Sequence, residues 1–410
     1  MSESAPLEPA APGLPLAGIK VVEASSFTFA PAAARILAEL GADVIKIEPL
    51  DGDKARALSR RIDVGDVPNV TIEIANRGKR SLALDLKSDE GVALLHRLVS
   101  RSDVFVTNFL PSARRRLRVD VDDLMKVNDR LVYALATGWG RRGPLVEQPG
   151  FDIIAAFAAS GLADAMTPPG GEPPRWSAPG ALDLLGSMTL AGAVSIGLLR
   201  AKTAGQGGVV DVSLLGIGTW ALGTPLSWLR YVGPPSSPEV VAGNPLIAWY
   251  RTSDGRWLYF AVAVFDEIWE DVCRRIDRAD LVRDPRFATA ESRAENYEWC
   301  RAVLREAFSA RPLSEWLERF ESFPKPWTWA KNLEEVFDDP TVRANGYIHS
   351  STTGAGAQID LASPPFQLDG VPVARDIPAP EVGAHTDEIL DELGFDAAQI
   401  ALMRKRDVIA

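Results

Sequence analysis

Asp183 is the residue of this chain with the clearest capacity for covalent chemistry. It stands directly before an uncharged segment, Leu184–Leu199, and a carboxylate beside such a segment is costly to desolvate unless another group pairs with it. The residue is therefore either a helix cap, since Asp is a favoured N-cap, or a reactive carboxylate that could serve as a nucleophile. The sequence around it leaves both interpretations open.

The two cysteines, Cys273 and Cys300, do not indicate a second kind of chemistry. They lie in helix-like segments without the spacing of metal ligands, which is typical of free thiols in a reducing compartment. We therefore expect no metal site and no thiol nucleophile. The N-terminal segment MSESAPLEPAAPGLP lacks the basic and apolar regions of a signal peptide. Leu184–Leu199 is shorter than the ~20 residues that cross a bilayer, so we expect a cytoplasmic protein without a membrane partner.

Length and charge narrow the class of partner. The chain has 410 residues, on the usual scale for two domains. Its net charge is −11, from 44 Lys and Arg against 55 Asp and Glu, which disfavours nucleic acid as a partner. A site for an anionic ligand would therefore need a local group of positively charged residues.

The elements that must position Asp183 follow a β–α alternation through the first half of the chain. Helix-like segments, one with Pro31 in its first turn, separate short β-branched runs. This pattern predicts an α/β fold with a largely parallel, doubly wound sheet, in which ligands bind beyond the carboxyl ends of the strands. The predicted strands are 19–24, 43–48, 81–86, 103–108, 131–136 and 209–214, and the predicted helices are 30–40, 88–100, 121–128 and 183–202.

The first strand-to-helix turn, SSFTFAPAAAR, contains no glycine, so it lacks the GxGxxG pattern that brings a dinucleotide pyrophosphate close to the backbone. The GKR sequence at 78–80 lacks the spacing of a Walker loop. Nicotinamide and ATP chemistry are therefore disfavoured.

After Gly216 the sequence pattern changes. A proline-rich stretch is followed by a hairpin pattern at 246–262, with its turn at Asp254–Gly255, and by further helical segments. This predicts a smaller α+β domain. We expect a large Rossmann-like domain over 16–222, a linker and small domain over 223–340, and a tail over 341–410 that packs back on the large domain.

Many segments in one order resemble family III coenzyme A transferases, also called the CaiB/BaiF family. The family includes formyl-CoA transferase and, as a divergent branch, α-methylacyl-CoA racemase. The resemblance runs from about Leu16 to the C-terminus through LAGIKVVEAS, LAELGADVIKIEP, NRGKRSLALDLKSDEG, DVFVTNF, TGWGRRGP, GQGGVVDVSL and GAHTDEILDELG. It implies a homodimer of two interlocked chains.

The resemblance also implies the chemistry of Asp183. It matches the family's nucleophile, which attacks the thioester of an acyl-CoA, forms an anhydride and then an aspartyl-CoA thioester, and finally passes CoA to a carboxylic acid. The implied function is that of an acyl-CoA:carboxylate CoA-transferase with the CoA thioester as substrate and no permanently bound cofactor or metal. A binding module for acyl-CoA without turnover is the alternative from another class.

CoA carries phosphates and an adenine, so its site needs cations and an apolar slot. The resemblance places two walls of this site; the charged members could equally be a solvated turn or a helix face. One departure from formyl-CoA transferases is Thr28, where some of them carry a Gln, and a second is the missing glycine-rich loop before the hairpin, so we do not expect oxalate or formate as substrate. The implied CoA-binding residues are Asn76, Lys79, Arg80, Leu84 and Lys87 on one wall and Asn108, Phe109, Arg116 and Leu117 on the other.

A racemase is the nearest competing function. Racemases of this family place a His in a GHD-like motif, whereas this chain has Phe151 between Gly150 and Asp152, and phenylalanine cannot accept a proton. Asp152 is either an accessory carboxylate that raises the pKa of Asp183 or the cap of a helix at 153–160.

Overall fold

The structure is a computed structural model that describes residues 13–58, 69–168, 170–176, 178–233, 244–262 and 266–410. The chain divides into two compact units, Met1–Gly223 with Pro340–Ala410, and Thr224–Asp339. The first unit carries the elements that surround Asp183.

The first unit is built on a six-stranded sheet in the order β3-β2-β1-β4-β5-β6, and every neighbouring pair is parallel. The predicted parallel α/β sheet is thereby confirmed. This order is that of a doubly wound fold, in which the chain starts at the centre and winds outward on both sides. The strands are β1 (Lys20–Ala24), β2 (Asp43–Glu48), β3 (Arg80–Ala83), β4 (Val104–Thr107), β5 (Val132–Thr137) and β6 (Gly208–Ser213).

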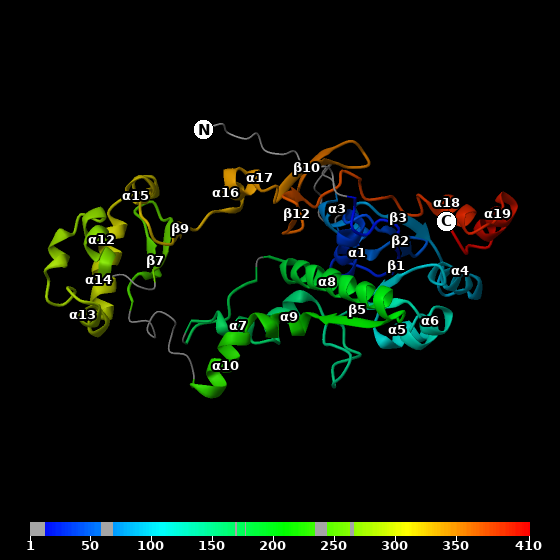
Figure 1. Ribbon diagram of the computed structural model, residues 1–410, viewed down its shortest axis with the longest axis horizontal. Helices are drawn as coiled ribbons and strands as arrows, with labels where there is room; N and C mark the ends of the chain where they lie inside the picture. Colours follow the sequence, from blue (N-terminus) through cyan, green and yellow to red (C-terminus); the bar gives the residue numbers. More distant parts are fainter. Residues whose placement is uncertain (1–12, 59–68, 169, 177, 234–243, 263–265) are drawn as a thin grey trace. The chain divides into compact units, whose positions relative to one another are not determined.

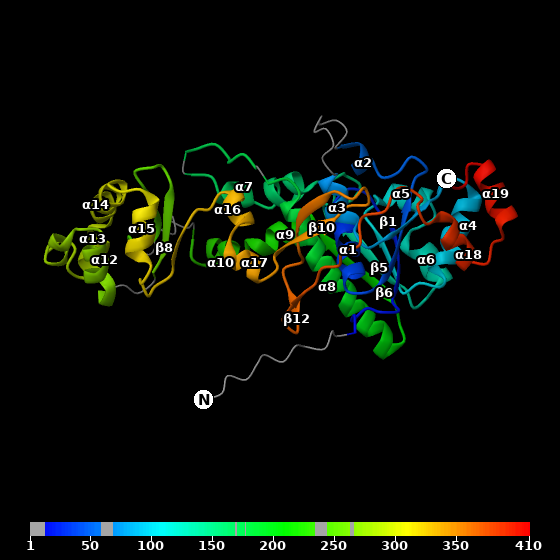
Figure 2. The same ribbon diagram turned by 90° about the horizontal axis from the view of Figure 1, so that it is seen from above.

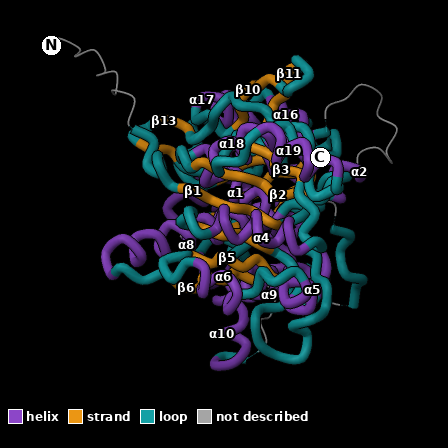
Figure 3. Tube along the Cα trace, turned by 90° about the vertical axis from the view of Figure 1, so that its right-hand side faces the viewer, coloured by secondary structure: helices purple, strands orange, loops and turns teal. Residues whose placement is uncertain are grey.

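Alternate residues of the strands face two separate cores, because successive side chains of a strand point to opposite faces. On β4, Val104 and Val106 pack with helices α1 (Phe29–Glu39) and α8 (Ala181–Ala204), whereas Phe105 packs on the other face with α4 (Asp89–Val99). Both faces are buried, which accounts for the continuous apolar runs in the sequence. Figures 1 and 3 show the strands of this sheet with helices on either side.

The predicted helices of this unit form, with ends that differ by one or two residues. Pro31 lies in the first turn of α1, and the Ser88 hydroxyl caps α4 by accepting the N–H of Gly91 at 3.0 Å. The remaining helices of this part are α2 (Lys54–Leu58), α3 (Val70–Asn76), α5 (Pro111–Arg116), α6 (Val121–Val127), the π-helix η2 (Asp152–Ala158), α7 (Leu162–Ala165) and α9 (Leu214–Ala221).

Helix α8 is longer than the uncharged segment that marked it in the sequence. Among the described residues it is the one helix that is long and apolar enough to cross a membrane by length and composition. However, Leu190, Val194 and Leu198 belong to the core beneath the sheet. The helix therefore packs as a core helix of the α/β unit.

The C-terminal tail returns to the first unit through α17 (Pro340–Ala344), the hairpin β10 (Ile348–Thr352) and β11 (Gln358–Ala362), the short pair β12 (Gln367–Leu368) and β13 (Val371–Pro372), α18 (Thr386–Glu392) and α19 (Ala397–Lys405). Figure 2 shows α18 and α19, in red, beside α4. His385 joins the tail to β3, because its ring Nδ1 accepts the N–H of Ser81 at 3.2 Å and its own N–H bonds to the Ser81 carbonyl.

The second unit has its own core. The antiparallel strands β7 (Ile247–Arg251), β8 (Trp257–Ala261) and β9 (Trp327–Trp329) pack against helices through buried aromatic side chains such as Phe260, Phe308 and Trp316. The hairpin turns at Asp254–Gly255, where Gly255 has a φ of +81°, a conformation that favours glycine. The helical elements of this unit are α10 (Gly223–Tyr231), η3 (Asp266–Ile268), α12 (Trp269–Arg275), η4 (Ala279–Val282), α13 (Ala290–Glu295), α14 (Tyr297–Ser309), α15 (Leu313–Phe320) and α16 (Leu333–Phe337).

Candidate active site

A cavity of about 1440 Å³ opens at the carboxyl ends of the parallel strands. Ligands bind at this edge in doubly wound sheets, so its place agrees with the expectation from the sequence. Segments that follow all six strands contribute to its lining, and Phe151 and Asp183 also belong to it. The strand-end segments are 25–29 after β1, 47–51 around the end of β2, 84–87 after β3, 108–117 after β4, 136–141 around the end of β5, and Leu214 after β6.

Asp183 lies in the first turn of α8 and lines this cavity. The N-cap of the helix is Gly180, with a φ of +82°, so the sequence-based interpretation of Asp183 as the cap is wrong. The carboxylate of Asp183 has no ion pair with any described residue. It is a half-buried carboxyl group at the positive end of a helix dipole.

The pKa of Asp183 is raised to about 7, mainly by burial and in smaller part by the negative charge of Asp152. Both causes disfavour the ionised carboxylate. Asp152 is itself buried, and its carboxylate accepts the N–H of Gly180 at 2.8 Å and the N–H of Ile153 at 2.8 Å. Asp152 therefore fixes the turn before α8 as well as acting on Asp183, whereas the sequence offered a helix cap and an accessory carboxylate as alternatives.

Phe151 is 49% exposed and lines the cavity in the place where a racemase would carry a His. Its ring packs edge-to-face on Phe27, with the ring centroids 5.6 Å apart. The two rings form an apolar part of the cavity wall. Thr28, which was singled out as a departure from formyl-CoA transferases, lies next to Phe27 in the same lining.

The cavity brings together six of the residues assigned to CoA from the sequence, and it leaves out three. Lys87 and Arg116 are exposed, and neither has an ion pair with a described residue, so both are available to an anionic ligand. The six that line the cavity are Leu84, Lys87, Asn108, Phe109, Arg116 and Leu117; Asn76, Lys79 and Arg80 do not line it.

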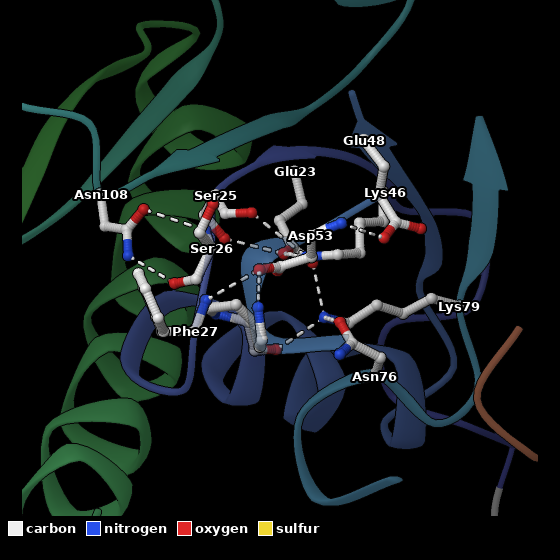
Figure 4. A network of polar contacts seen from close by, with 12 residues as sticks. Glu23, Ser25, Ser26, Phe27, Lys46, Glu48, Asp53, Asn76, Lys79 and Asn108 are labelled. Atoms are coloured by element: carbon white, nitrogen blue, oxygen red, sulfur yellow. Dashed lines mark hydrogen bonds and ion pairs between the residues drawn. The ribbon is translucent and has the colours of Figure 1, made fainter. Parts of the chain in front are cut away.

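Lys79, which the sequence resemblance assigned to CoA binding, belongs to a buried ion network and does not line the cavity. Its ammonium group lies 2.5 Å from Glu23 and donates to Asn76 Oδ1 at 3.1 Å, as Figure 4 shows. Although burial alone would raise the pKa of Glu23, the charges of Lys46 and Lys79 outweigh it and hold this pKa at about 2. Withdrawing Lys79 for a ligand would leave a buried carboxylate short of a partner.

Arg80 and Asn108 also have protein partners. Arg80 does not line the cavity, and its guanidinium pairs with Asp43 at 2.7 Å and Glu392 at 2.7 Å. The Asn108 side chain reaches the cavity, but its Oδ1 accepts the N–H of Ser26 at 3.1 Å and its Nδ2 donates to the Ser26 carbonyl at 2.7 Å. Its amide group therefore supports the β1–α1 turn.

Sequence reasoning missed several cavity residues. Lys54, Arg115 and Arg141 add positive charge to the lining, and Trp139 adds an aromatic face. Arg115 is partly neutralised by Glu147 at 2.7 Å. The signal was available, because each follows or flanks a predicted strand end, where the fold concentrates ligand contacts. Among the described residues no cluster of His, Cys, Asp and Glu has an arrangement suited to a metal ion.

Comparison with known proteins bears on this site. The sequence profile of CoA-transferase family III matches residues 16–386. The (R)-2-hydroxy-4-methylpentanoate CoA-transferase of Clostridioides difficile is 31% identical over 96% of this chain and 99% of its own length. The cinnamoyl-CoA:phenyllactate CoA-transferase of Clostridium sporogenes is 30% identical over 95% of each chain. A CAIB/BAIF family protein of Brucella suis has a similar structure, with a TM-score of 0.80, 27% identity, and coverage of 92% of this chain and 99% of its own.

Proposed function

The chain belongs to CoA-transferase family III and is a CoA-transferase, and we propose that it moves CoA from an acyl-CoA to a free carboxylic acid through covalent intermediates on Asp183. The observation that carries the proposal is the Asp183 carboxylate, which lies without an ion pair to a described residue in the large cavity and has a raised pKa. A group with a perturbed pKa in a cleft is a candidate for chemistry.

The reaction begins when an Asp183 oxygen attacks the thioester carbonyl and the C–S bond breaks, which gives an aspartyl anhydride and the CoA thiolate. The thiolate attacks the aspartyl carbonyl, the donor acid leaves as a carboxylate, and an aspartyl-CoA thioester remains. An acceptor carboxylate attacks this thioester and displaces the thiolate. The thiolate then attacks the acceptor carbonyl of the second anhydride, which releases the new acyl-CoA and restores the Asp183 carboxylate.

Trapping tests this role directly. Incubation with an acyl-CoA and hydroxylamine should leave an aspartyl hydroxamate at Asp183, located by peptide mass spectrometry. The Asp183→Asn variant should retain CoA affinity and lose transfer by several orders of magnitude, because a neutral amide cannot form the anhydride. An unmodified Asp183 in wild-type protein that binds acyl-CoA would instead support a binding module without turnover.

For CoA itself we propose a site between the two strand-end walls. Lys87 and Arg116, which have no ion pair with a described residue, supply cations for its phosphates, with Leu84, Phe109 and Leu117 as apolar neighbours. Lys54 and Arg141 are further cations of the lining. This assignment drops Asn76, Lys79 and Arg80, which have structural partners instead.

We propose an acceptor bulkier than formate or oxalate. The two CoA-transferases named above act, by their names, on a branched and an aromatic 2-hydroxy acid, and the Phe27–Phe151 wall offers an apolar surface of suitable kind. A panel of carboxylates against several acyl-CoA donors, analysed by mass spectrometry, tests this. Faster turnover of oxalate with formyl-CoA than of any larger acid would contradict it.

We also propose that the enzyme is an interlocked homodimer in the cytoplasm. Supporting features are exposed apolar residues on α8 and α9, among them Leu185, Ile196, Leu199 and Trp220, and the two free cysteines. Light scattering after gel filtration would test the dimer, and cell fractionation would test the location. A monomer in solution would contradict the first proposal.

A further inference from the structure

A buried group of charges lies behind the turn that joins β1 to α1, and its central members do not line the cavity. Lys46 is fully buried, with Glu23 at 2.9 Å and Asp53 at 3.0 Å, and Asp53 is 3% exposed. Charges are seldom placed so deeply unless they are paired, and these are paired with one another. The CoA-transfer chemistry proposed above uses none of them.

This group holds the backbone of the turn. Lys46 donates to the carbonyl of Ser25 at 3.2 Å, and Asp53 Oδ1 accepts the N–H of Phe27 at 3.4 Å and of Ala55 at 2.9 Å. From the other side Asn108 bonds to both backbone groups of Ser26. Figure 4 shows these contacts meeting at the turn. Residues 25–27 are therefore fixed from two directions.

The turn needs such support because of Phe27. Its φ is +66°, in the left-handed region, where a side chain with a Cβ is strained. Strained conformations of this kind persist only where the surroundings over-determine them, and they gather at functional sites. The contact from Asp53 is made to the backbone N–H of this strained residue.

The same turn touches the helix that carries Asp183. The carbonyl of Phe29 accepts the hydroxyl of Ser187 on α8 at 2.7 Å. Gly186 makes room for the Phe29 ring, since a Cβ at that position would lie 2.7 Å from it. Phe27 in turn packs on Phe151 in the cavity wall. A shift of the turn would thus move both the wall and the support of Asp183.

We propose that Asp53 is a positioning residue for CoA transfer, which acts by holding Phe27 in its left-handed conformation and so fixes the cavity wall relative to Asp183. This role rests on the proposed function of Asp183. Asp53 itself contacts no substrate in this proposal, and it acts through the backbone of the turn.

The first test compares Asp53→Ala with Glu39→Ala. Glu39 is an equally buried carboxylate, paired with Arg35 at 2.7 Å on the same α1 helix, but it does not contact the turn. We expect the rate of Asp183 adduct formation at saturating acyl-CoA, measured per folded protein, to fall at least tenfold for Asp53→Ala. It should change less than twofold for Glu39→Ala.

The second test separates positioning from loss of stability. The rate of Asp183 adduct formation in the double variant Asp53→Ala with Phe27→Gly should be at least threefold higher than in Asp53→Ala with Phe27→Ala. Both changes remove the ring, but only glycine adopts a positive φ without strain. If Asp53→Ala acted only by lowering stability, the two double variants would show equal rates per folded protein.

Three results would overturn the role. A wild-type rate in folded Asp53→Ala, or equal rates in the glycine and alanine double variants, would reject it while leaving Asp183 as the nucleophile. Absence of any adduct in the wild-type protein would reject the proposed function and this role together.

Discussion

The carboxylate of Asp152 accepts the backbone N–H of Gly180 at 2.8 Å, and Gly180 is the N-cap of the helix whose first turn carries Asp183. One buried carboxylate thus fixes the turn before the proposed nucleophile and adds negative charge near it. Its charge adds to the effect of burial in raising the pKa of Asp183 to about 7. A carboxylate tuned in this way stays partly protonated near neutrality, and its reactivity depends on pH.

The first prediction concerns that pH dependence. Only ionised Asp183 can attack a thioester, so adduct formation at saturating acyl-CoA should be slow at pH 5 and rise through a midpoint near 7. Asp152→Asn removes the smaller of the two causes, so the midpoint should move to lower pH while burial keeps it above the ordinary value. Single-turnover rates across the pH range measure this.

Asp51→Asn is the matched control for that shift. Asp51 is another carboxylate of the cavity lining, but it is not among the causes of the raised pKa of Asp183. The midpoint of the pH profile of Asp51→Asn should equal that of the wild-type protein. Equal midpoints for Asp152→Asn and wild type would show that Asp152 has no electrostatic effect on the reaction.

The second prediction concerns stability. The unfolded chain releases the Asp183 proton near the ordinary value of 3.8, whereas the folded chain holds it to about 7, so ionisation of this group costs the wild-type protein stability as pH rises between those values. Asp183→Asn removes the cost. The free energy of unfolding of the variant should exceed that of wild type at pH 8 by at most about 4 kcal/mol, at about 1.4 kcal/mol per pH unit, reduced by solvent screening at this half-buried site.

Chemical denaturation at pH 4 and pH 8 checks this sign. At pH 4 the carboxyl is largely protonated in the folded state and the two proteins should differ little. If the difference in unfolding free energy between the variant and wild type did not grow from pH 4 to pH 8, the Asp183 carboxylate would not be desolvated in the folded protein.

The sheet was predictable because its strands carry a strong signal. Asp43–Glu48 was predicted residue for residue, since its β-branched residues Val44, Ile45 and Ile47 favour a strand. The start of α8 could not be predicted from the sequence. Its cap is Gly180 in a left-handed conformation, and the position of Asp183 within the first turn depends on a bond from Asp152, far away in sequence.

The residues assigned to CoA from the sequence show the same limit of sequence-based prediction. Lys79 and Lys87 stand in one motif and look equivalent in the sequence, yet Lys87 is exposed at the cavity and Lys79 is buried against Glu23. Lys79 precedes β3, whereas Lys87 follows it, on the side where the cavity opens, and Lys79 has a partner more than fifty positions earlier in the chain. Such pairing has no local signature, so motif membership alone cannot separate ligand contacts from structural ion pairs.

The third prediction tests that distinction. Lys87→Ala and Arg116→Ala should each weaken CoA binding by about 1–2 kcal/mol, roughly fivefold to thirtyfold, because each removes a cation available to a phosphate. Arg130→Ala serves as control, since Arg130 is also an exposed cation but does not line the cavity. Calorimetric titration with CoA gives the affinities. If all three variants bound CoA equally well, the phosphates would have to lie elsewhere.

The last prediction separates transfer from racemisation. Phe151 cannot accept a proton, and none of the three histidines, His96, His349 and His385, lines the cavity. The wild-type protein should therefore incorporate no deuterium from solvent at the α-carbon of a 2-methylacyl-CoA, as followed by mass spectrometry. Phe151→His puts an imidazole on the cavity wall and should gain slow incorporation, whereas Phe151→Leu should gain none. Deuterium incorporation by the wild-type protein would mean that another group acts as the base. Racemisation would then be the better-supported activity.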